Sequence, residues 1–212
     1  MNWTLGATLE NLTLTGSATT GGGNSKANVI LGNAGANTLS SGAGDDTVSG
    51  GSGNDTINGS TGADRLTGGS GNDVFVLNTR TGSDNITDFV TGTDDLRISQ
   101  ASLRIGDGDT TVEGAVRLGG PGGFASSAEL VIITGNAASL STSSAAAAIG
   151  AATSAYTVGR TVLFAVDNGS STGVYLFTAA DANTQVSASE LTLLATLTGT
   201  PLTSSLDYVF SA

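Results

Sequence analysis

The sequence predicts a mainly β fold, with a parallel β-solenoid followed by a β-rich C-terminal part that contains one or two short helices. Two observations support this prediction. A nine-residue repeat runs between residues 23 and 76, and the composition changes to strand-like apolar segments after about residue 100. The chain has 212 residues, of which 32 are Gly. A periodic, glycine-rich segment is typical of repeat proteins, in which each unit packs against its neighbours.

Nine-residue units follow one another without interruption from residue 32. They read GNAGANTLS (32–40), SGAGDDTVS (41–49), GGSGNDTIN (50–58), GSTGADRLT (59–67) and GGSGNDVFV (68–76), and a degenerate unit, GNSKANVIL (23–31), precedes them in register. In all five units the fourth residue is Gly, the sixth is Asn or Asp, and the eighth is apolar. A flexible Gly/Ser/Asn linker has no reason to keep one apolar residue in phase with an acid. The repeat therefore predicts a folded solenoid.

Each unit combines a tight turn with a very short strand. The glycines of the first half can adopt the positive φ angles that tight turns require. The last three residues suffice for a short strand with one side chain turned inward. If two units complete one turn of the solenoid, residues 18 apart stack on strands about 4.8 Å apart. Asp46 should then lie near Asp64, and Asp55 near Asp73.

Stacked carboxylates need a positively charged partner. Two carboxylates about 5 Å apart repel by roughly 3 kcal/mol at an effective dielectric constant near 20. The chain has 18 Asp and Glu against 7 Lys and Arg, and half of its carboxylates lie between Asp45 and Asp95. Carboxylates and turn carbonyls are the oxygen ligands that Ca²⁺ prefers, six to eight at a time. The sequence therefore predicts several Ca²⁺ ions between successive turns.

The composition disfavours several other functions. Because the chain has no His and no Cys, it cannot form a His-based triad, a Cys nucleophile, a His-ligated zinc site or a disulfide. A formal net charge of −11 disfavours binding to nucleic acid. No run of 18 apolar residues predicts a membrane span, and the N-terminus has no Sec-type signal pattern. With no nucleophile–base pair in view, we expect no enzymatic activity in these residues.

The repeats resemble those of the RTX (repeats-in-toxin) family, which has GGxGxDxUx nonapeptides. The resemblance implies a right-handed parallel β-roll solenoid of the serralysin type. It also implies an extracellular protein, secreted or on the cell surface of a Gram-negative-type bacterium. Such proteins leave the cell unfolded through the type I secretion machinery and fold outside, where calcium is abundant. The expected partners are therefore calcium ions and that machinery.

The resemblance also implies two sets of calcium ligands. One set would be Ser41, Ala43 and Asp46 facing Ser60, Gly62 and Asp64, and the other Gly50, Ser52 and Asp55 facing Gly69, Gly71 and Asp73. The N-terminal units depart from the family pattern, because Asn28 and Asn37 replace Asp and Lys26 replaces Gly. Sites that pair Asn28 with Asp46, or Asn37 with Asp55, are therefore expected to be weak.

The segments on both sides of the repeats are expected to cap the roll. LENLTLTGS (9–17) alternates apolar and polar residues and predicts a strand. SDNITDFVTGTDDLRIS (83–99) resembles the segment that closes the roll in serralysin-type RTX proteins, with Ile86, Asp88 and Phe89 as its I-x-D-F element. Asp88 is accordingly a candidate calcium ligand. Weaker candidates are Asp84, Asp94 and Asp95, and a solvated turn is an equal alternative for the last two. Arg97 stands where the family often has Asp, which argues against a further site there.

Residues 100–212 predict a mixture of strands and short helices. The segments are GDGDT (106–110) as a hairpin turn, ELVIIT (129–134) as a buried strand, SLSTSSAAAAIGAATSAY (139–156) as a helix, TVLFAVDNGSSTGVYLFTAAD (161–181) as an Asn-Gly hairpin, and SASELTLLATL (187–197) as a segment that begins with a helix-type capping box. An ion site at GDGDT is a lesser alternative. The final LDYVFSA is similar to the ends of type I secretion signals.

Together these patterns predict three parts and leave more than one function open. The parts are N-terminal capping strands (1–22), an RTX calcium-binding β-roll with its cap (23–99) and a β-rich C-terminal secretion domain (100–212). The favoured function is a module that folds on calcium binding outside the cell and serves as the secretion and stability domain of a type I secreted protein. The alternative is a calcium-dependent structural subunit of a surface layer, adhesin or filament that self-associates on the cell surface. An enzyme would need a catalytic domain upstream.

Overall fold

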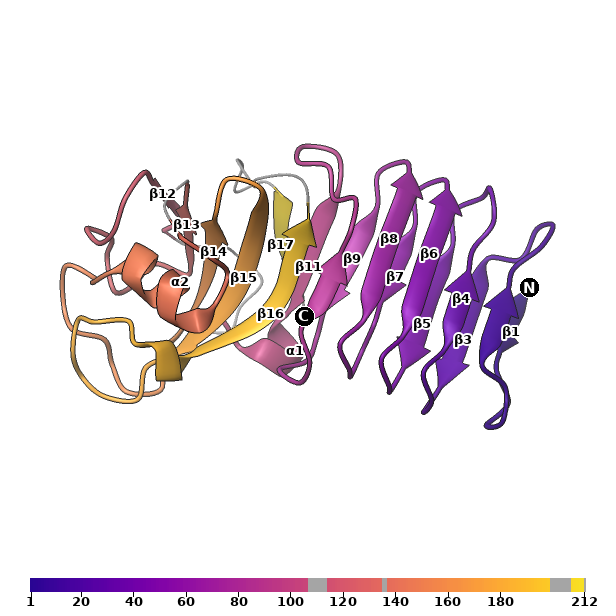
Figure 1. The fold of residues 1–212 in the computed structure, drawn as a ribbon, viewed down its shortest axis with the longest axis horizontal. Coiled ribbons are helices and arrows are strands. Elements are labelled where there is room, and N and C mark those ends of the chain that lie inside the picture. The colour runs from indigo at the N-terminus through magenta and orange to yellow at the C-terminus, as the bar shows by residue number, and fades with distance from the viewer. Residues whose placement is uncertain (107–113, 135–136, 199–206, 212) are drawn as a thin grey trace.

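The protein is a stack of short strands along one long axis (Figure 1). The computed structural model describes residues 1–106, 114–134, 137–198 and 207–211. The strands of the first half are β1 (Asn2–Thr4), β2 (Asn11–Thr13), β3 (Thr20–Asn24), β4 (Val29–Leu31), β5 (Thr38–Gly42), β6 (Thr47–Ser52), β7 (Thr56–Asn58), β8 (Arg65–Ser70), β9 (Val74–Leu77), β10 (Asp84–Ile86) and β11 (Asp95–Ser99). The second half contains β12 (Val116–Leu118), β13 (Leu130–Ile133), β14 (Thr161–Asp167), β15 (Ser171–Thr178), β16 (Leu191–Thr198), β17 (Tyr208–Ser211), α1 (Gln100–Leu103), α2 (Thr142–Ile149) and a 3₁₀ turn (Ala188–Glu190).

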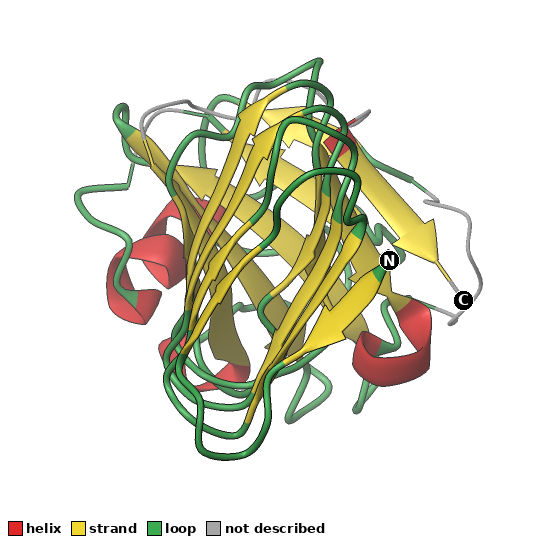
Figure 2. Cartoon of the chain, turned by 90° about the vertical axis from the view of Figure 1, so that its right-hand side faces the viewer, coloured by secondary structure: helices red, strands yellow, loops and turns green. Residues whose placement is uncertain are grey.

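From β1 to β11, successive strands alternate between two facing sheets, which Figure 2 shows from the N-terminal end. Among the described residues, one sheet has the order β1-β3-β5-β7-β9-β11-β17, and the other has the order β12-β13-β14-β15-β16-β10-β8-β6-β4-β2. All pairs from β1 to β11 are parallel, and within the repeats the paired residues are 18 apart, as in Val48 with Leu66. The predicted parallel solenoid with two units per turn is therefore confirmed.

The eighth residues of the repeat form two inward-facing rows. Leu39, Ile57 and Phe75 stack in one sheet, and Ile30, Val48 and Leu66 stack in the other. All six side chains are buried in one hydrophobic core cluster. The cluster continues into the C-terminal half through residues such as Leu163 and Leu176. One apolar residue per nine is enough because each rung presents its side chain to the same narrow interior.

Replacing an inward leucine should destabilise the protein far more than replacing an outward one in the same sheet. Leu66 on β8 is 0% exposed, and Leu31 on β4 is 41% exposed. We expect Leu66→Ala to lower the free energy of unfolding by about 2–5 kcal/mol, because it leaves a cavity in the core. We expect Leu31→Ala to lower it by less than about 1 kcal/mol. Urea denaturation of both variants in calcium measures the difference, and equal losses would contradict the assigned core.

The C-terminal half continues the two sheets of the roll. Strand β16 pairs in parallel with β10, and β17 pairs in parallel with β11. The segment 83–99 was expected to close the roll, but it contributes β10 and β11 as further rungs, and the closing strands come from more than 90 residues later. The aspartate just before β17, Asp207, accepts hydrogen bonds from the Thr91 hydroxyl and from the Gly92 N–H, the latter at 2.8 Å. It thereby ties the end of the chain to the turn between β10 and β11.

Several expectations for this half are confirmed. The Asn-Gly hairpin is present as antiparallel β14 and β15, the buried strand as β13, and the helix as the shorter α2, where the Ser141 hydroxyl accepts from Ser144 N–H. The capping box of Ser187 and Glu190 is also present. It begins only a 3₁₀ turn, however, and the apolar run after it is strand β16, which lies between β15 and β10. Sheet pairing overrides the local helix signal there. Most of GDGDT lies outside the described residues.

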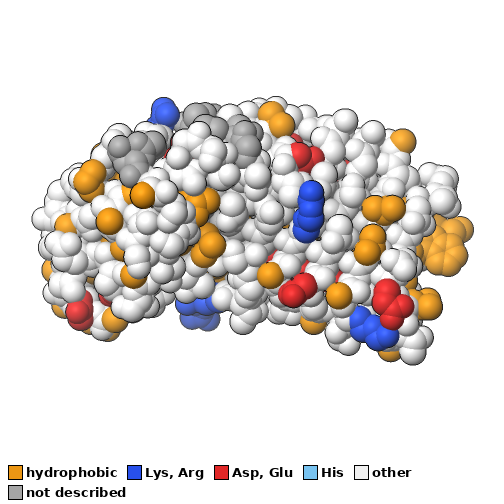
Figure 3. Space-filling view, viewed as in Figure 1, with side chains coloured by type: hydrophobic (Ala, Val, Ile, Leu, Met, Phe, Trp, Pro, Cys, Tyr) orange, Lys and Arg blue, Asp and Glu red, His pale blue; other side chains and the backbone are white. Residues whose placement is uncertain are grey.

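Figure 3 shows few charged side chains on one face, scattered among uncharged ones. The largest exposed apolar residues of the N-terminal end are Met1 and Trp3. Within the described chain, no helix has the length and apolar character needed to cross a membrane.

Candidate calcium sites

The sixth residues of the repeat, together with Asp84 and Asp94 after it, form two ladders, one along each edge of the roll. The first ladder is Asn28, Asp46, Asp64 and Asp84, and the second is Asn37, Asp55, Asp73 and Asp94; all eight side chains are buried. In each ladder, a carboxylate Oδ1 accepts a hydrogen bond from the backbone N–H of the previous member. Asp64 accepts from Asp46 at 2.8 Å, and Asp73 accepts from Asp55 at 2.9 Å. The predicted stacking of these aspartates is therefore what the structure shows.

The turn glycines leave space for the second carboxylate oxygen. A Cβ atom added at Gly50, Gly59 or Gly68, the first residue of its unit, would overlap the Oδ2 atom of Asp55, Asp64 or Asp73, respectively. The first position of these units must therefore be small, because the carboxylate of the sixth position lies directly against it.

A methyl group at Gly59 should therefore disturb the first ladder. We expect Gly59→Ala to displace the Asp64 carboxylate and to weaken calcium binding at least about tenfold at the affected turn, which corresponds to about 1.4 kcal/mol. Gly6→Ala is the matched control, because an added Cβ there meets nothing within 4 Å. Calorimetric calcium titrations of both variants test this expectation. Unchanged binding by the Gly59 variant would contradict it.

Burial makes the negative charge of these ladders unfavourable. Desolvation raises the pKa of Asp55 and of Asp64 to about 6, and that of Asp84 to about 7. The neighbouring carboxylate of the ladder adds to the increase, as Asp64 does for the pKa of Asp84. Desolvation likewise raises the pKa values of Asp46, Asp73 and Asp94. The ladders thus hold carboxyl groups that are costly to ionise without a nearby cation.

Within the described residues, no Lys or Arg side chain forms an ion pair with a ladder carboxylate. In the described part of the chain, the ion pairs join Lys26 to Glu10 and Arg160 to Glu129, and neither involves a ladder residue. The Oδ2 atoms of Asp46, Asp55 and Asp64 are buried and have no hydrogen-bond partner. Buried acceptors of this kind are rare, and a bound ion is one of the few arrangements that satisfies them. The ladder aspartates therefore fit the calcium ions that the repeat implies.

Carboxylates alone would not complete a calcium shell. No group of three or more acidic side chains suited to a metal ion occurs among the residues described, so turn carbonyls must supply the remaining ligands. The fold brings both predicted ligand sets together. Ala43 pairs with Thr61, which places Ser41 and Ala43 beside Ser60 and Gly62. In the other set, the pairing of Gly51 with Gly69 places Gly50 and Ser52 beside Gly69 and Gly71.

At the C-terminal ends of the ladders, the aspartates that continue the stacking are Asp84 and Asp94 rather than Asp88. Asp84 accepts from Asp64 N–H at 3.2 Å, and Asp94 accepts from Asp73 N–H at 3.0 Å, so these two residues continue the ladders. Asp88, the favoured candidate, instead accepts from Gly68 N–H and Gly69 N–H and holds that turn from outside the ladders. Asp95 is half-buried on β11, paired with Val74. The spacing increases from 18 to 20 and 21 residues at these last steps, which hid Asp84 and Asp94 from the nine-residue register.

The fifth position of the repeat also connects successive turns, which the sequence analysis did not predict. The Asp45 carboxylate accepts from Ala63 N–H at 2.9 Å, and the Asn54 amide oxygen accepts from Asn72 N–H at 3.0 Å. Both contacts join positions 18 residues apart. The recurrence of Asp or Asn at this position in three of the five units was the available signal.

A comparison with protein-family models agrees with the repeat pattern. The family model for the RTX calcium-binding nonapeptide repeat (4 copies) matches residues 22–57 and 49–79. Among solved structures, the chain is similar to the AlgE6R3 subunit of the mannuronan C5-epimerase from Azotobacter vinelandii. The identity is 20%, the TM-score is 0.44, and the match covers 98% of this chain and 81% of that one. No curated protein matches the sequence. Residues 22–79 of this chain thus belong to the RTX calcium-binding nonapeptide repeats, a β-roll type that is typical of secreted proteins.

Proposed function

We propose that this protein is a calcium-dependent folding module, which folds outside the cell and serves as the C-terminal secretion and stability domain of a type I secreted bacterial protein. The proposal includes the division into capping strands (1–22), calcium-binding roll (23–99) and C-terminal secretion domain (100–212). It also includes the two ligand sets given above, together with Asp88. The role of these residues in the proposal is structural rather than catalytic.

The observation that supports the proposal most strongly is the pair of buried carboxylate ladders, which form no ion pair with a described Lys or Arg. Asp46, Asp55 and Asp64 each have a buried Oδ2 atom without a hydrogen-bond partner. Bound calcium would supply the positive charge that offsets their repulsion. The aspartates and turn carbonyls of two successive rungs would then be held together, and ordering one rung would favour ordering the next. We expect affinities on the order of 10⁻⁴ to 10⁻³ M, as in other extracellular modules.

The position of the C-terminal strand is consistent with secretion before folding. Tyr208 and Phe210 on β17 are buried, and Asp207 is bound to the turn at residues 91–92. The two aromatic side chains of this segment, which is proposed as part of the secretion signal, are thus accessible in the unfolded chain and buried in the folded one. Low calcium inside the cell would keep them accessible.

A calcium titration followed by far-UV circular dichroism tests the proposal, with magnesium and EDTA as controls and sedimentation in parallel. We expect a sigmoidal gain of β signal that is specific to calcium, at constant monomer mass. A full β signal in EDTA that calcium does not change would contradict calcium-dependent folding.

A structural subunit is the second candidate, and an exposed aromatic side chain on strand β1 favours it. Strands β1 and β2 are the terminal strands of their sheets, and Trp3 on β1 is 52% exposed. Unpaired edges of this kind can pair with another chain. If calcium produced the same gain of β signal together with increasing mass, self-association on a cell surface would become the better account.

A further inference from the structure

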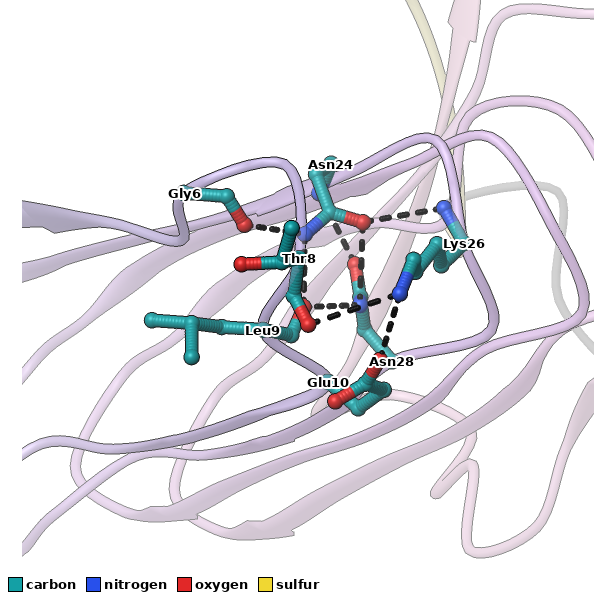
Figure 4. A network of polar contacts seen from close by, with 7 residues as sticks. All are labelled: Gly6, Thr8, Leu9, Glu10, Asn24, Lys26 and Asn28. Atoms are coloured by element: carbon teal, nitrogen blue, oxygen red, sulfur yellow. Dashed lines mark hydrogen bonds and ion pairs between the residues drawn. The ribbon is translucent and has the colours of Figure 1, made fainter.

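The loop of residues 24–28 is held by a hydrogen-bond network (Figure 4). The network joins the side chains of this loop to each other and to the backbone of the preceding loop. The Asn24 amide nitrogen donates to Gly6 O at 2.9 Å and to Leu9 O at 2.6 Å, while its oxygen accepts from Lys26 N–H at 2.9 Å. The Asn28 amide nitrogen donates to Asn24 Oδ1 at 3.2 Å and to Leu9 O at 3.4 Å, and its oxygen accepts from Asn24 N–H at 2.8 Å. Every polar atom of the two asparagine side chains has a partner.

The same network recurs nine residues later, on the opposite edge of the roll. The Asn33 amide nitrogen donates to Ala18 O at 2.7 Å, and its oxygen accepts from Gly35 N–H at 2.9 Å. The Asn37 amide nitrogen donates to Ala18 O and to Asn33 Oδ1, each at 3.2 Å, and its oxygen accepts from Asn33 N–H at 2.8 Å. The loops of residues 24–28 and 33–37 therefore share one arrangement of paired asparagines.

The second and sixth residues of each unit change together along the chain. Asn at the second position occurs with Asn at the sixth, in the units that contain Asn24 with Asn28 and Asn33 with Asn37. The four later units have Gly or Ser at the second position and Asp at the sixth: Gly42 with Asp46, Gly51 with Asp55, Ser60 with Asp64 and Gly69 with Asp73. In the six units, Asn at the second position never occurs with Asp at the sixth, and Gly or Ser at the second position never occurs with Asn at the sixth.

The two combinations differ in how they satisfy the backbone carbonyl oxygens of the neighbouring loop. An ionised carboxylate can only accept hydrogen bonds, so it cannot satisfy a carbonyl oxygen beside it without a cation. An asparagine amide donates directly to such carbonyls, as Asn24 and Asn28 do to Leu9 O. This difference agrees with the unpartnered Oδ2 atoms of Asp46, Asp55 and Asp64. In the loop of residues 24–28, the Lys26 ammonium adds a fixed positive charge at 3.4 Å from Thr8 O and 2.6 Å from the Glu10 carboxylate.

We propose that the paired asparagines at 24/28 and 33/37 replace calcium in the two loops of residues 23–28 and 32–37, which therefore fold without the ion and present a preformed edge to the calcium-dependent loops that follow. Asn24 and Asn33 are the determining residues, because their amides occupy the turn where the later units have Gly or Ser. The amides donate to residues 6–9 and to residues 16–18, so the inference concerns the contacts of each loop with the loop before it. The weak sites expected between Asn28 and Asp46 and between Asn37 and Asp55 lie on the other side of these loops. The inference rests on the proposed function only for the statement that later turns need calcium.

Residue-resolved hydrogen exchange of the full chain in EDTA tests this inference. The backbone N–H groups of Asn24, Lys26, Asn33 and Gly35 donate to asparagine oxygens, whereas those of Asp46 and Asp55 donate to ladder carboxylates. We expect the first four to exchange at least about tenfold more slowly than the last two in EDTA, because local stability differs between the turns. Equal exchange in EDTA, followed by protection of both groups at one calcium concentration, would overturn the inference.

A double variant provides a second test. Asn33→Gly with Asn37→Asp gives the unit 32–40 the residues that the later units have at these positions. We expect this variant to bind one more calcium ion per chain in equilibrium dialysis. Its Gly35 N–H should also lose protection in EDTA. The same amount of bound calcium as in the unmodified protein would overturn the inference. A failure of calcium to protect residues 46–76 would instead contradict the proposed function, and protection of the asparagine turns in EDTA would still support this inference.

Discussion

Asp64→Asn should destabilise the calcium-loaded protein and stabilise the calcium-free protein. Asp64 is 1% exposed, lies in the middle of its ladder between Asp46 and Asp84, and has a buried Oδ2 atom without a partner. With calcium present, loss of this charge should lower the free energy of unfolding by about 3–5 kcal/mol, as for one partner of a buried charge pair. Without calcium, removing the repulsion should increase stability, on the order of 1 kcal/mol. The asparagine oxygen can still accept from Asp46 N–H.

The loss of stability with calcium and the gain of stability without calcium are measured separately. Urea denaturation in calcium gives the loss, and the folded fraction in EDTA, from circular dichroism at pH 7.5, gives the gain. Asp181→Asn is the matched control, because it makes the same chemical change at an exposed turn residue. A loss of stability under both conditions would mean that Asp64 stabilises the roll without a cation, and the account of the ladder would be wrong.

The stability of the calcium-free protein should decrease as pH rises from about 5 to 8. Desolvation raises the pKa values of Asp55 and Asp64 to about 6 and that of Asp84 to about 7, from an ordinary value of 3.8. Between pH 3.8 and these values, the folded state binds more protons than the unfolded state, so stability falls with increasing pH. The stabilisation is complete below the unfolded pKa and is lost as pH passes through 6 and 7. Each pKa unit corresponds to at most about 1.4 kcal/mol per group.

Calcium should reverse this dependence, because it competes with protons for the same oxygens. We expect the calcium-loaded protein to lose stability below about pH 6, where the ladder aspartates take up protons. Thermal unfolding from pH 5 to 8 in EDTA and in excess calcium gives the two profiles. Profiles that rise with pH in EDTA would show that the ladder carboxylates are stabilised as anions by the protein alone.

The repeat made much of the roll predictable from sequence. A side chain every ninth residue, such as Leu39 or Ile57, faces the interior by geometry alone, and the same period aligns Asp46 with Asp64. Local rules also sufficed for the hairpin β14–β15, where an Asn-Gly turn joins two apolar runs. Both kinds of prediction depend on residues that are close in sequence or related by a fixed period.

The remaining features depend on contacts that no local pattern encodes. Asp84 and Asp94 join the ladders after steps of 20 and 21 residues, so their turns differ from those of the repeat. The apolar run after Glu190 becomes β16 because β15 and β10 flank it in the sheet. The pairing of β17 with β11 joins residues more than 100 positions apart. The asparagine networks were visible as departures from the repeat, but only the structure shows that their amides satisfy the turn carbonyls.

The most direct test of the calcium ladders is a crystal structure of the calcium-loaded protein with anomalous diffraction data collected at a long wavelength. We expect anomalous peaks between the turns of Asp46 and Asp64 and between those of Asp55 and Asp73, each within about 2.3–2.6 Å of carboxylate and carbonyl oxygens. A folded roll in saturating calcium, with no peak beside these aspartates, would contradict the account.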